Sequence, residues 1–226
     1  MMTERAAKLI DMVLSHEGGY SSGNEKQTKG DKGKETYCGI SRVYNPNWKG
    51  WTIVDKYKPI KYNTIIDDNT LKQYVKEYYY SAYYTPLKCD SFDSLLIAGH
   101  LFCHGVNAGV KTSAKLLQKA INKVYGINLS VDGIVGTNTL KYSNGDKKTE
   151  VETEFINKRN QYYKSLVEKN PSQKKFLKGW LNRVQKTTQT CHSSHNVLFT
   201  SLNNGGIIKT ILSFAYVLIK MFLKKG

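Results

Sequence analysis

The sequence has few cysteines, and none of them is arranged as in a disulfide framework or a zinc site. Four cysteines occur in 226 residues, and no two of them form a CxxC pair. A small scaffold held together by disulfides is therefore not expected. We expect free or buried thiols in a reducing compartment, at Cys38, Cys89, Cys103 and Cys191.

Acidic residues are also scarce. The chain has 18 acidic residues against 34 basic ones, which gives a formal net charge of +16. Such a charge attracts polyanions: nucleic acid, anionic membranes or cell wall. No helix-turn-helix pattern, zinc-finger spacing or glycine-rich phosphate loop is present, so nucleic acid is not expected as a partner.

Long apolar runs are missing from the N-terminal part of the chain. No such run follows Met1, so we expect synthesis in the cytoplasm without a signal peptide. The exception lies at the other end, where residues 207–223 read IIKTILSFAYVLIKMFL. Seventeen residues are at the short end for crossing a bilayer.

The basic residues of this apolar run fall on one helical stripe, together with Lys224. The segment either spans a membrane with Lys209 and Lys220 snorkelling, or lies in the interface with the stripe toward anionic headgroups. A helix docked on the protein itself is the third alternative. We expect membrane association.

Strand-period alternation and internal repeats are absent, whereas helical spacing recurs along the chain. Apolar residues recur at helical spacing before Glu17 and again over residues 111–126, and residues 149–168 form one long expected helix. The fold class is therefore mainly α. Residues 186–206 lose this periodicity and turn polar, which predicts a linker.

The stretch LSHEGGYSS at residues 14–22 places a glutamate before two glycines, at the end of the first expected helix. Gly18 and Gly19 are typical helix-ending residues, since glycine takes the left-handed conformation at little cost. Glu17 is then expected at a helix C-terminus, where the helix dipole disfavours an ionised carboxylate. Such a place suits an acid that must keep its proton.

Several motifs, in order, resemble those of a known family. HEGGY, followed by DKGKETYCGIS at residues 31–41, resembles the family-108 glycoside hydrolases, N-acetylmuramidases also described as secretion activators and phage-type endolysins. LFCHGVNAGVKTSAKLLQKAIN and VDGIVGTNTL resemble the companion predicted peptidoglycan-binding domain, and RNQYYKSL and FLKGWLNRV its closing helices. The resemblance covers residues 4–185. The chain departs from the pattern at Lys34, where glycine is usual, and at Cys103, where aspartate is usual.

The resemblance implies a lysozyme-like helical catalytic domain over residues 1–92 and a helical peptidoglycan-binding domain over residues 93–185. The linker at 186–206 and the apolar helix at 207–223 follow them. The implied activity is hydrolysis of the β-1,4 bond between N-acetylmuramic acid and N-acetylglucosamine in peptidoglycan. The enzyme would act on the cell wall from a membrane-associated position.

Glycosidic cleavage needs an acid that protonates the departing oxygen, and the resemblance assigns this role to Glu17. Gly18 and Gly19 would leave room for a sugar ring, and an ion pair of Glu17 with a lysine is the structural alternative. Asp31 fits the family motif as a second catalytic carboxylate; it could equally cap its own loop.

Three further residues of these motifs could contact substrate: Tyr20, Thr36 and Tyr37. Packing is the alternative for each of them. Glu35 sits where the family shows no acid, so we interpret it as a surface residue. No metal or organic cofactor is implied.

Two rival functions remain open from the sequence. His16 or His104 could pair with Cys38 or Cys103 in a cysteine-dependent amidase, although no local signature of such enzymes surrounds either cysteine. His100 and His104 have a metal-ligand spacing without the HExxH glutamate, so a packed pair is favoured. The other rival is a non-catalytic wall-binding or membrane-tethered protein. A turn at residues 132–136 could bind wall or only brace its domain.

Overall fold

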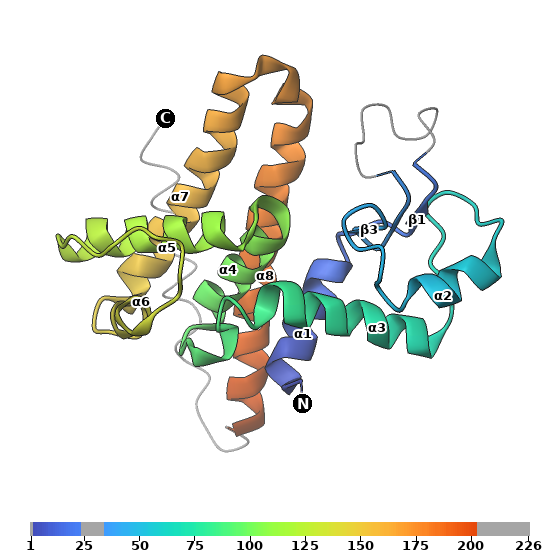
Figure 1. Ribbon diagram of the computed structural model, residues 1–226. Helices are drawn as coiled ribbons and strands as arrows, with labels where there is room; N and C mark the ends of the chain where they lie inside the picture. The colour runs from blue at the N-terminus through green and yellow to red at the C-terminus, as the bar shows by residue number, and fades with distance from the viewer. Residues whose placement is uncertain (1, 24–33, 203–226) are drawn as a thin grey trace. The chain divides into compact units, whose positions relative to one another are not determined.

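The computed structural model describes residues 2–23 and 34–202, with residues 194–202 described in backbone only. The chain divides into two compact units, Met1–Cys191 and His192–Gly226. The expectation of a mainly α fold is confirmed (Figure 1). The apolar run at 207–223 and Asp31 lie outside the described residues.

Eight α-helices provide most of the described structure: α1 (Glu4–Leu14), α2 (Trp51–Val54), α3 (Asn69–Tyr79), α4 (Leu95–Ala108), α5 (Val110–Tyr125), α6 (Thr137–Ser143), α7 (Lys148–Lys169) and α8 (Lys174–Leu202). Shorter helical turns are η1 (Asp55–Tyr57), η2 (Tyr80–Tyr84), η3 (Cys89–Ser91) and η4 (Pro171–Gln173). Three short strands form an antiparallel sheet in the order β1 (Tyr20–Ser21), β2 (Thr36–Tyr37), β3 (Ile40–Ser41).

Helix α4 is the centre of the first unit. All nine residues from Ile97 to Gly105 are buried, so this helix is covered on every side, as expected of a helix that is apolar all round. Ser94 caps its start by accepting a hydrogen bond from the Ile97 N–H at 3.0 Å. Helices α1, α5 and α7 contact it.

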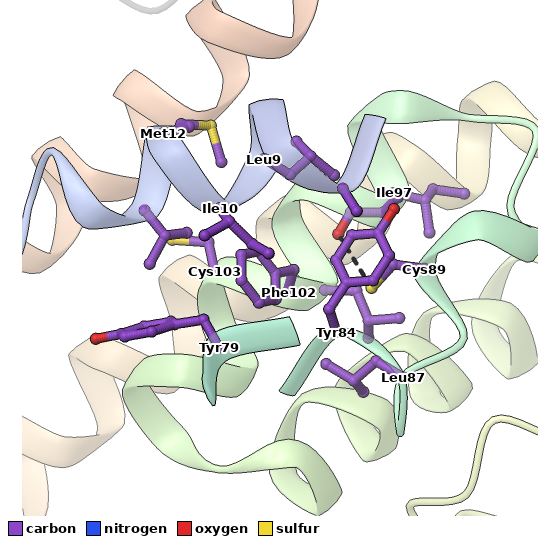
Figure 2. Close-up of a cluster of buried hydrophobic side chains, with 14 of the residues drawn as sticks. Leu9, Ile10, Met12, Tyr79, Tyr84, Leu87, Cys89, Ile97, Phe102 and Cys103 are labelled. Atoms are coloured by element: carbon purple, nitrogen blue, oxygen red, sulfur yellow. Dashed lines mark hydrogen bonds between the residues drawn. The ribbon is translucent and has the colours of Figure 1, made fainter. Parts of the chain in front are cut away.

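Helix α1 lies against α3 and α4 through the apolar stripe seen in the sequence. Leu9, Ile10 and Val13 are at most 2% exposed, and they meet Phe102 of α4 and Tyr79 of α3 in one cluster (Figure 2). Burial of this stripe fixes the end of α1, and with it the position of the chain that follows.

Strands β2 and β3 are joined by a two-residue turn in which both residues have positive φ. Tyr37 pairs with Ile40, and the turn residues are Cys38 at φ 47° and Gly39 at φ 75°. Two positive φ values define the type I′ turn, whose twist suits a short hairpin. The hairpin places Cys38 and Gly39 beside the end of α1.

The prediction of a polar linker from residue 186 is wrong for the residues up to 202. Helix α8 continues through this stretch as far as Leu202, and Thr187 and Cys191 are buried on it. The sequence looked irregular because the buried positions here are small and polar rather than large and apolar.

Within residues 2–23 and 34–202, no helix is both long and apolar enough to cross a membrane.

Candidate active site

Glu17 lies just beyond α1 rather than within its last turn. The helix ends at Leu14, and the Glu17 N–H donates to the Leu14 carbonyl at 3.1 Å. Neither Gly18 nor Gly19 has a positive φ, so the expected left-handed glycine ending is wrong. Ser15 is the C-cap residue of this helix, and it keeps a right-handed helical conformation.

The two glycines serve a different purpose, close packing against residues 63–64. A Cβ on Gly19 would lie 2.3 Å from the Thr64 carbonyl oxygen, closer than any real contact. The Gly19 N–H also donates to Asn63 Oδ1 at 2.9 Å. The expectation that Gly19 leaves room for a sugar ring is therefore wrong, because neighbouring backbone fills that space.

The glycine that borders the Glu17 carboxylate is Gly39, in the β2–β3 turn. A Cβ there would lie 3.0 Å from Glu17 Oε2 and 2.8 Å from the Tyr79 hydroxyl. Tyr79 donates to the Cys38 carbonyl at 2.8 Å, which anchors the turn to α3. Helix α1, helix α3 and the hairpin thus meet at one carboxylate oxygen.

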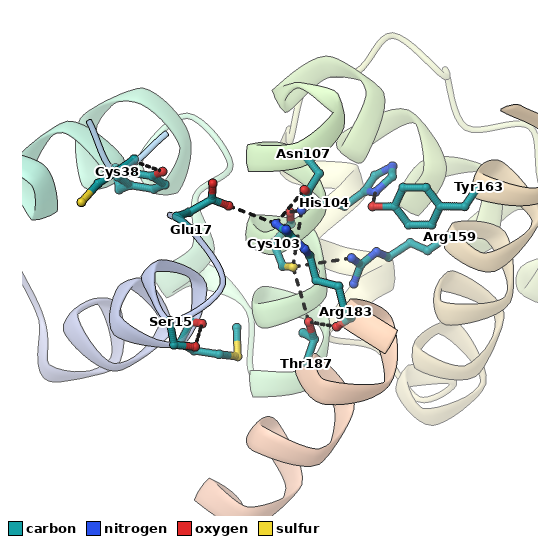
Figure 3. A network of polar contacts seen from close by, with 12 residues as sticks. Ser15, Glu17, Cys38, Cys103, His104, Asn107, Arg159, Tyr163, Arg183 and Thr187 are labelled. Carbon is teal, nitrogen blue, oxygen red and sulfur yellow. Dashed lines mark hydrogen bonds and ion pairs between the residues drawn. The ribbon is translucent and has the colours of Figure 1, made fainter. Parts of the chain in front are cut away.

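The other carboxylate oxygen is held by an arginine from α8. Arg183 Nη1 lies 3.0 Å from Glu17 Oε1 and donates to Asn107 Oδ1 at 2.8 Å (Figure 3). The Glu17 and Arg183 side chains are 19% and 23% exposed, so solvent reaches both. The sequence had offered a lysine as an alternative partner; the structure provides an arginine.

Two tyrosines near Glu17 keep their protons. Burial, reinforced by the negative charge of Glu17, raises the pKa of Tyr79 far above its ordinary value. Burial raises the pKa of Tyr83 as well, with Tyr78 and Glu17 contributing. Both hydroxyls are therefore neutral near pH 7 and can act as hydrogen-bond donors.

Neither Cys38 nor Cys103 is suited to be the nucleophile of a cysteine-dependent amidase. Burial raises the pKa of the Cys38 thiol to about 11, and Glu17 adds to the shift against an opposing effect of the Tyr37 hydrogen bond. Cys38 is thus protonated near pH 7, whereas the thiolate is the nucleophile. Cys103 is 1% exposed, out of reach of a polymeric substrate.

The predicted contact residues on strands β1 and β2 lie mostly inside the fold. Tyr20 is 6% exposed and donates to Glu35 Oε1 at 3.1 Å. Tyr37 is 1% exposed, and its hydroxyl accepts from the Ile66 N–H at 3.0 Å. Thr36 is half-buried between its strand neighbours. Packing thus accounts for the two tyrosines.

Glu35, interpreted from the sequence as a surface residue, is instead a partly buried ion-pair partner. Its side chain is 18% exposed, and its Oε1 lies 2.7 Å from Lys58 Nζ. Lys58 also pairs with Asp55 at 2.8 Å, and the two carboxylates raise the pKa of its ammonium against the effect of desolvation. These pairs fix the hairpin to the segment after α2.

His100 and His104 are core residues of α4. Both are fully buried; His104 Nδ1 lies 3.1 Å from the Tyr163 hydroxyl, and His100 Nε2 lies 3.0 Å from Thr188 Oγ1. Desolvation, followed by the charge of Arg159, lowers the pKa of His104 to about 3. The described residues contain no cluster suited to a metal ion.

Arg183 and Asn107 are site residues that the sequence did not single out. Arg183 lies in FLKGWLNRV, a motif noticed only for its resemblance to closing helices. It is 166 positions from Glu17, so no local pattern could have joined the two.

Comparison with known families assigns both halves of the first unit. Residues 10–109 match the family model Glycosyl hydrolase 108, and residues 112–185 match Predicted Peptidoglycan domain. By these matches the chain is similar to a glycosyl hydrolase 108 domain followed by a predicted peptidoglycan domain. The resemblance noted in the sequence is thereby confirmed.

Brucella abortus SagA is among the solved structures that are similar to this chain. The two share 19% sequence identity at a TM-score of 0.58, over 83% of this chain and 94% of SagA. At this identity the likeness shows a shared fold. A search of curated proteins found no match.

The two matched segments meet at the candidate site. Glu17 and Asn107 belong to the glycosyl hydrolase 108 domain, whereas Arg183 belongs to the peptidoglycan domain. The combination supports a glycosidase that hydrolyses peptidoglycan.

The turn at residues 132–136 is held inside the peptidoglycan domain by a buried glutamine of α5. Gln118 donates to Asp132 Oδ1 at 2.8 Å and accepts from the Gly133 N–H at 2.9 Å. Gly133 has φ +82°, and a Cβ there would lie 2.8 Å from the Lys111 carbonyl oxygen. These contacts give the turn a bracing role.

Proposed function

We propose that this protein is an N-acetylmuramidase, a lysozyme that cleaves the β-1,4 bond between N-acetylmuramic acid and N-acetylglucosamine. The observation that carries the proposal is the position of Glu17. Its carboxylate is solvent-accessible, and its Oε2 borders the positive-φ turn at Gly39, where a Cβ would lie only 3.0 Å from it. A carboxyl group in such a place can protonate the glycosidic oxygen as general acid.

The arginine contact requires one further step in this mechanism. An ion-paired carboxylate has no proton to donate, so Arg183 must leave Glu17 Oε1 when substrate binds, and Glu17 must take up a proton from solvent before it acts as the acid. Arg183 already shares Nη1 with Asn107, and peptidoglycan carries carboxylates on its stem peptides and on lactyl groups that bear no stem. A substrate carboxylate replaces Glu17 as the partner of the guanidinium, a pairing that arginine favours.

A second carboxylate completes the proposal. Asp31 is assigned to orient or activate the attacking water, or to stabilise the oxocarbenium ion. Its support is the motif DKGKETYCGIS, whose TYCGIS end forms the hairpin beside Glu17.

We also propose that the segment 207–223 associates with anionic membranes and keeps the enzyme near the wall, during phage lysis or wall remodelling. Its support is composition alone: one apolar run with lysines on one stripe. Flotation of full-length protein and a 1–206 truncation with anionic liposomes tests it. Full-length protein that stays with the soluble fraction contradicts the assignment.

The bond specificity is tested by digesting purified peptidoglycan and analysing the fragments by mass spectrometry. The proposal predicts muropeptides with N-acetylmuramic acid at the new reducing end. Fragments ending in reducing N-acetylglucosamine would indicate a glucosaminidase, and free stem peptides would indicate an amidase. No fragments would indicate the non-catalytic wall-binding alternative.

A further inference from the structure

Helix α8 carries three side chains in a row that ends at Glu17. Phe176, Trp180 and Arg183 are spaced i, i+4, i+7, so they share one stripe of the helix. Seven residues of helix span about 10 Å along the axis. The stripe runs from the end of α8 nearest η4 to Arg183. Figure 3 shows the contact of Arg183 with the Glu17 carboxylate.

The two aromatic rings of this stripe form an ordered platform. Trp180 stacks on the buried ring of Tyr163 in α7, with centroids 5.4 Å apart and planes at 24°. Phe176 lies against Trp180 at 5.9 Å and 33°. Tyr163 is 3% exposed and bonded to His104, so the platform is anchored in the core.

The outer end of the platform is open to solvent. Phe176 is 50% exposed, an unusual state for a phenylalanine already ordered against a neighbouring ring. Lys175 Nζ lies 5.0 Å from the centre of this ring. The surface is therefore aromatic and basic together.

The combination of aromatic rings and basic groups matches the chemistry of peptidoglycan. Pyranose rings present flat C–H faces that pack on aromatic rings, burying apolar surface. Carboxylates of the stem peptides attached to the sugars would meet Lys175 and Arg183. The stripe ends at Glu17, the proposed acid of the glycosidase. This position favours a glycan as the ligand over a protein partner, which would have no reason to bind along a path to that residue.

We propose that Phe176, Trp180 and Arg183 form a glycan-binding track that carries one peptidoglycan strand into the site at Glu17. The proposal rests on the function proposed above for its ligand, and it adds where the peptidoglycan domain takes hold of the strand. The aromatic rings hold sugars beyond the cleaved bond, and Arg183 binds a carboxylate of the strand where the track reaches the catalytic domain.

The test measures binding without cleavage. All variants are made in full-length protein carrying Glu17→Gln, and their affinity for purified insoluble peptidoglycan is measured by co-sedimentation. Phe176→Ala should weaken binding about fivefold to tenfold, because the variant removes the ring whose exposed half would pack on a sugar. Phe176→Trp should retain it. Ile134→Ala is the matched control, since Ile134 is 62% exposed on the same domain but off the stripe.

A second probe separates stacking from charge. The soluble, uncharged hexamer of N-acetylglucosamine should also bind more weakly to Phe176→Ala, and added salt should not remove this difference. Equal binding by Phe176→Ala and its parent, or an equal loss in Ile134→Ala, would overturn the track. A loss that appears only with peptidoglycan and disappears in salt would also overturn it. Binding is measured separately from cleavage. A wild-type protein that binds peptidoglycan without cleaving it would therefore refute the proposed enzymatic function but not the glycan-binding track.

Discussion

Replacing Gly39 with alanine tests whether the β2–β3 turn shapes the site at Glu17. The residue has φ +75°, and the added Cβ would lie 3.0 Å from Glu17 Oε2 and 2.8 Å from the Tyr79 hydroxyl. Left-handed backbone strain on alanine costs about 1–2 kcal/mol. The methyl group must in addition displace the carboxylate or the anchoring hydroxyl.

Gly126 provides a matched control for the strain alone. It has φ +65° at the end of α5, and a Cβ there meets nothing within 4 Å. Gly126→Ala should lower the free energy of unfolding by about 1–2 kcal/mol, a shift in Tm of about 2–8 °C, and Gly39→Ala should lower it by at least as much. Only Gly39→Ala should lower activity, by about 100-fold for a displacement of about 1 Å at the acid.

The assay is the release of new reducing ends from purified peptidoglycan, with Tm measured on the same preparations. If Gly39→Ala cleaves as fast as Gly126→Ala, the turn does not set the position of the catalytic carboxyl. If both variants lose activity in parallel, strain and not the contact with Glu17 is the cause.

Three further changes test separate parts of the structure. Asp31→Asn should lower peptidoglycan cleavage less than Glu17→Gln, since solvent partly replaces a group that positions water; equal losses would make Asp31 a full catalytic partner. His104 has a folded pKa of about 3 against 6.5 in the unfolded chain, so below pH 6.5 only the unfolded state gains its proton. Stability should fall by about 1.4 kcal/mol per pH unit from about pH 6.5 downward, and His104→Gln should reduce that slope in urea unfolding. Cys103→Asp should raise Tm relative to Cys103→Ser, because Cys103 Sγ lies 3.7 Å from Nη2 of the fully buried Arg159; a lower Tm would show that the site does not accept a carboxylate.

Local patterns predicted the local structure well. Helical spacing of Leu9, Ile10 and Val13 predicted the buried face of α1, and Thr3 caps its start by accepting from the Ala6 N–H at 3.1 Å. The apolar stretch of residues 95–108 forms α4, which ends at Gly109 with φ +91°. These features depend on residues within one or two turns of each other.

Features that depend on distant residues were missed. The glycines after Glu17 were read as a helix ending, but Gly19 is required by the backbone at Thr64. The partner of Glu17 comes from α8, which the sequence divided between a closing helix and a linker. Burial of Thr187 and Cys191 stabilises that helix, although neither residue marks an apolar face by its type.

The central claim is that Glu17 is the general acid of a peptidoglycan glycosidase. Its most direct test is cleavage of purified peptidoglycan by wild type and by Glu17→Gln, followed as new reducing ends, with circular dichroism confirming the fold. The amide has no proton to donate, so the variant should lose at least about 100-fold in rate while keeping its Tm. A folded Glu17→Gln variant that cleaves peptidoglycan at a near wild-type rate would remove Glu17 from the mechanism.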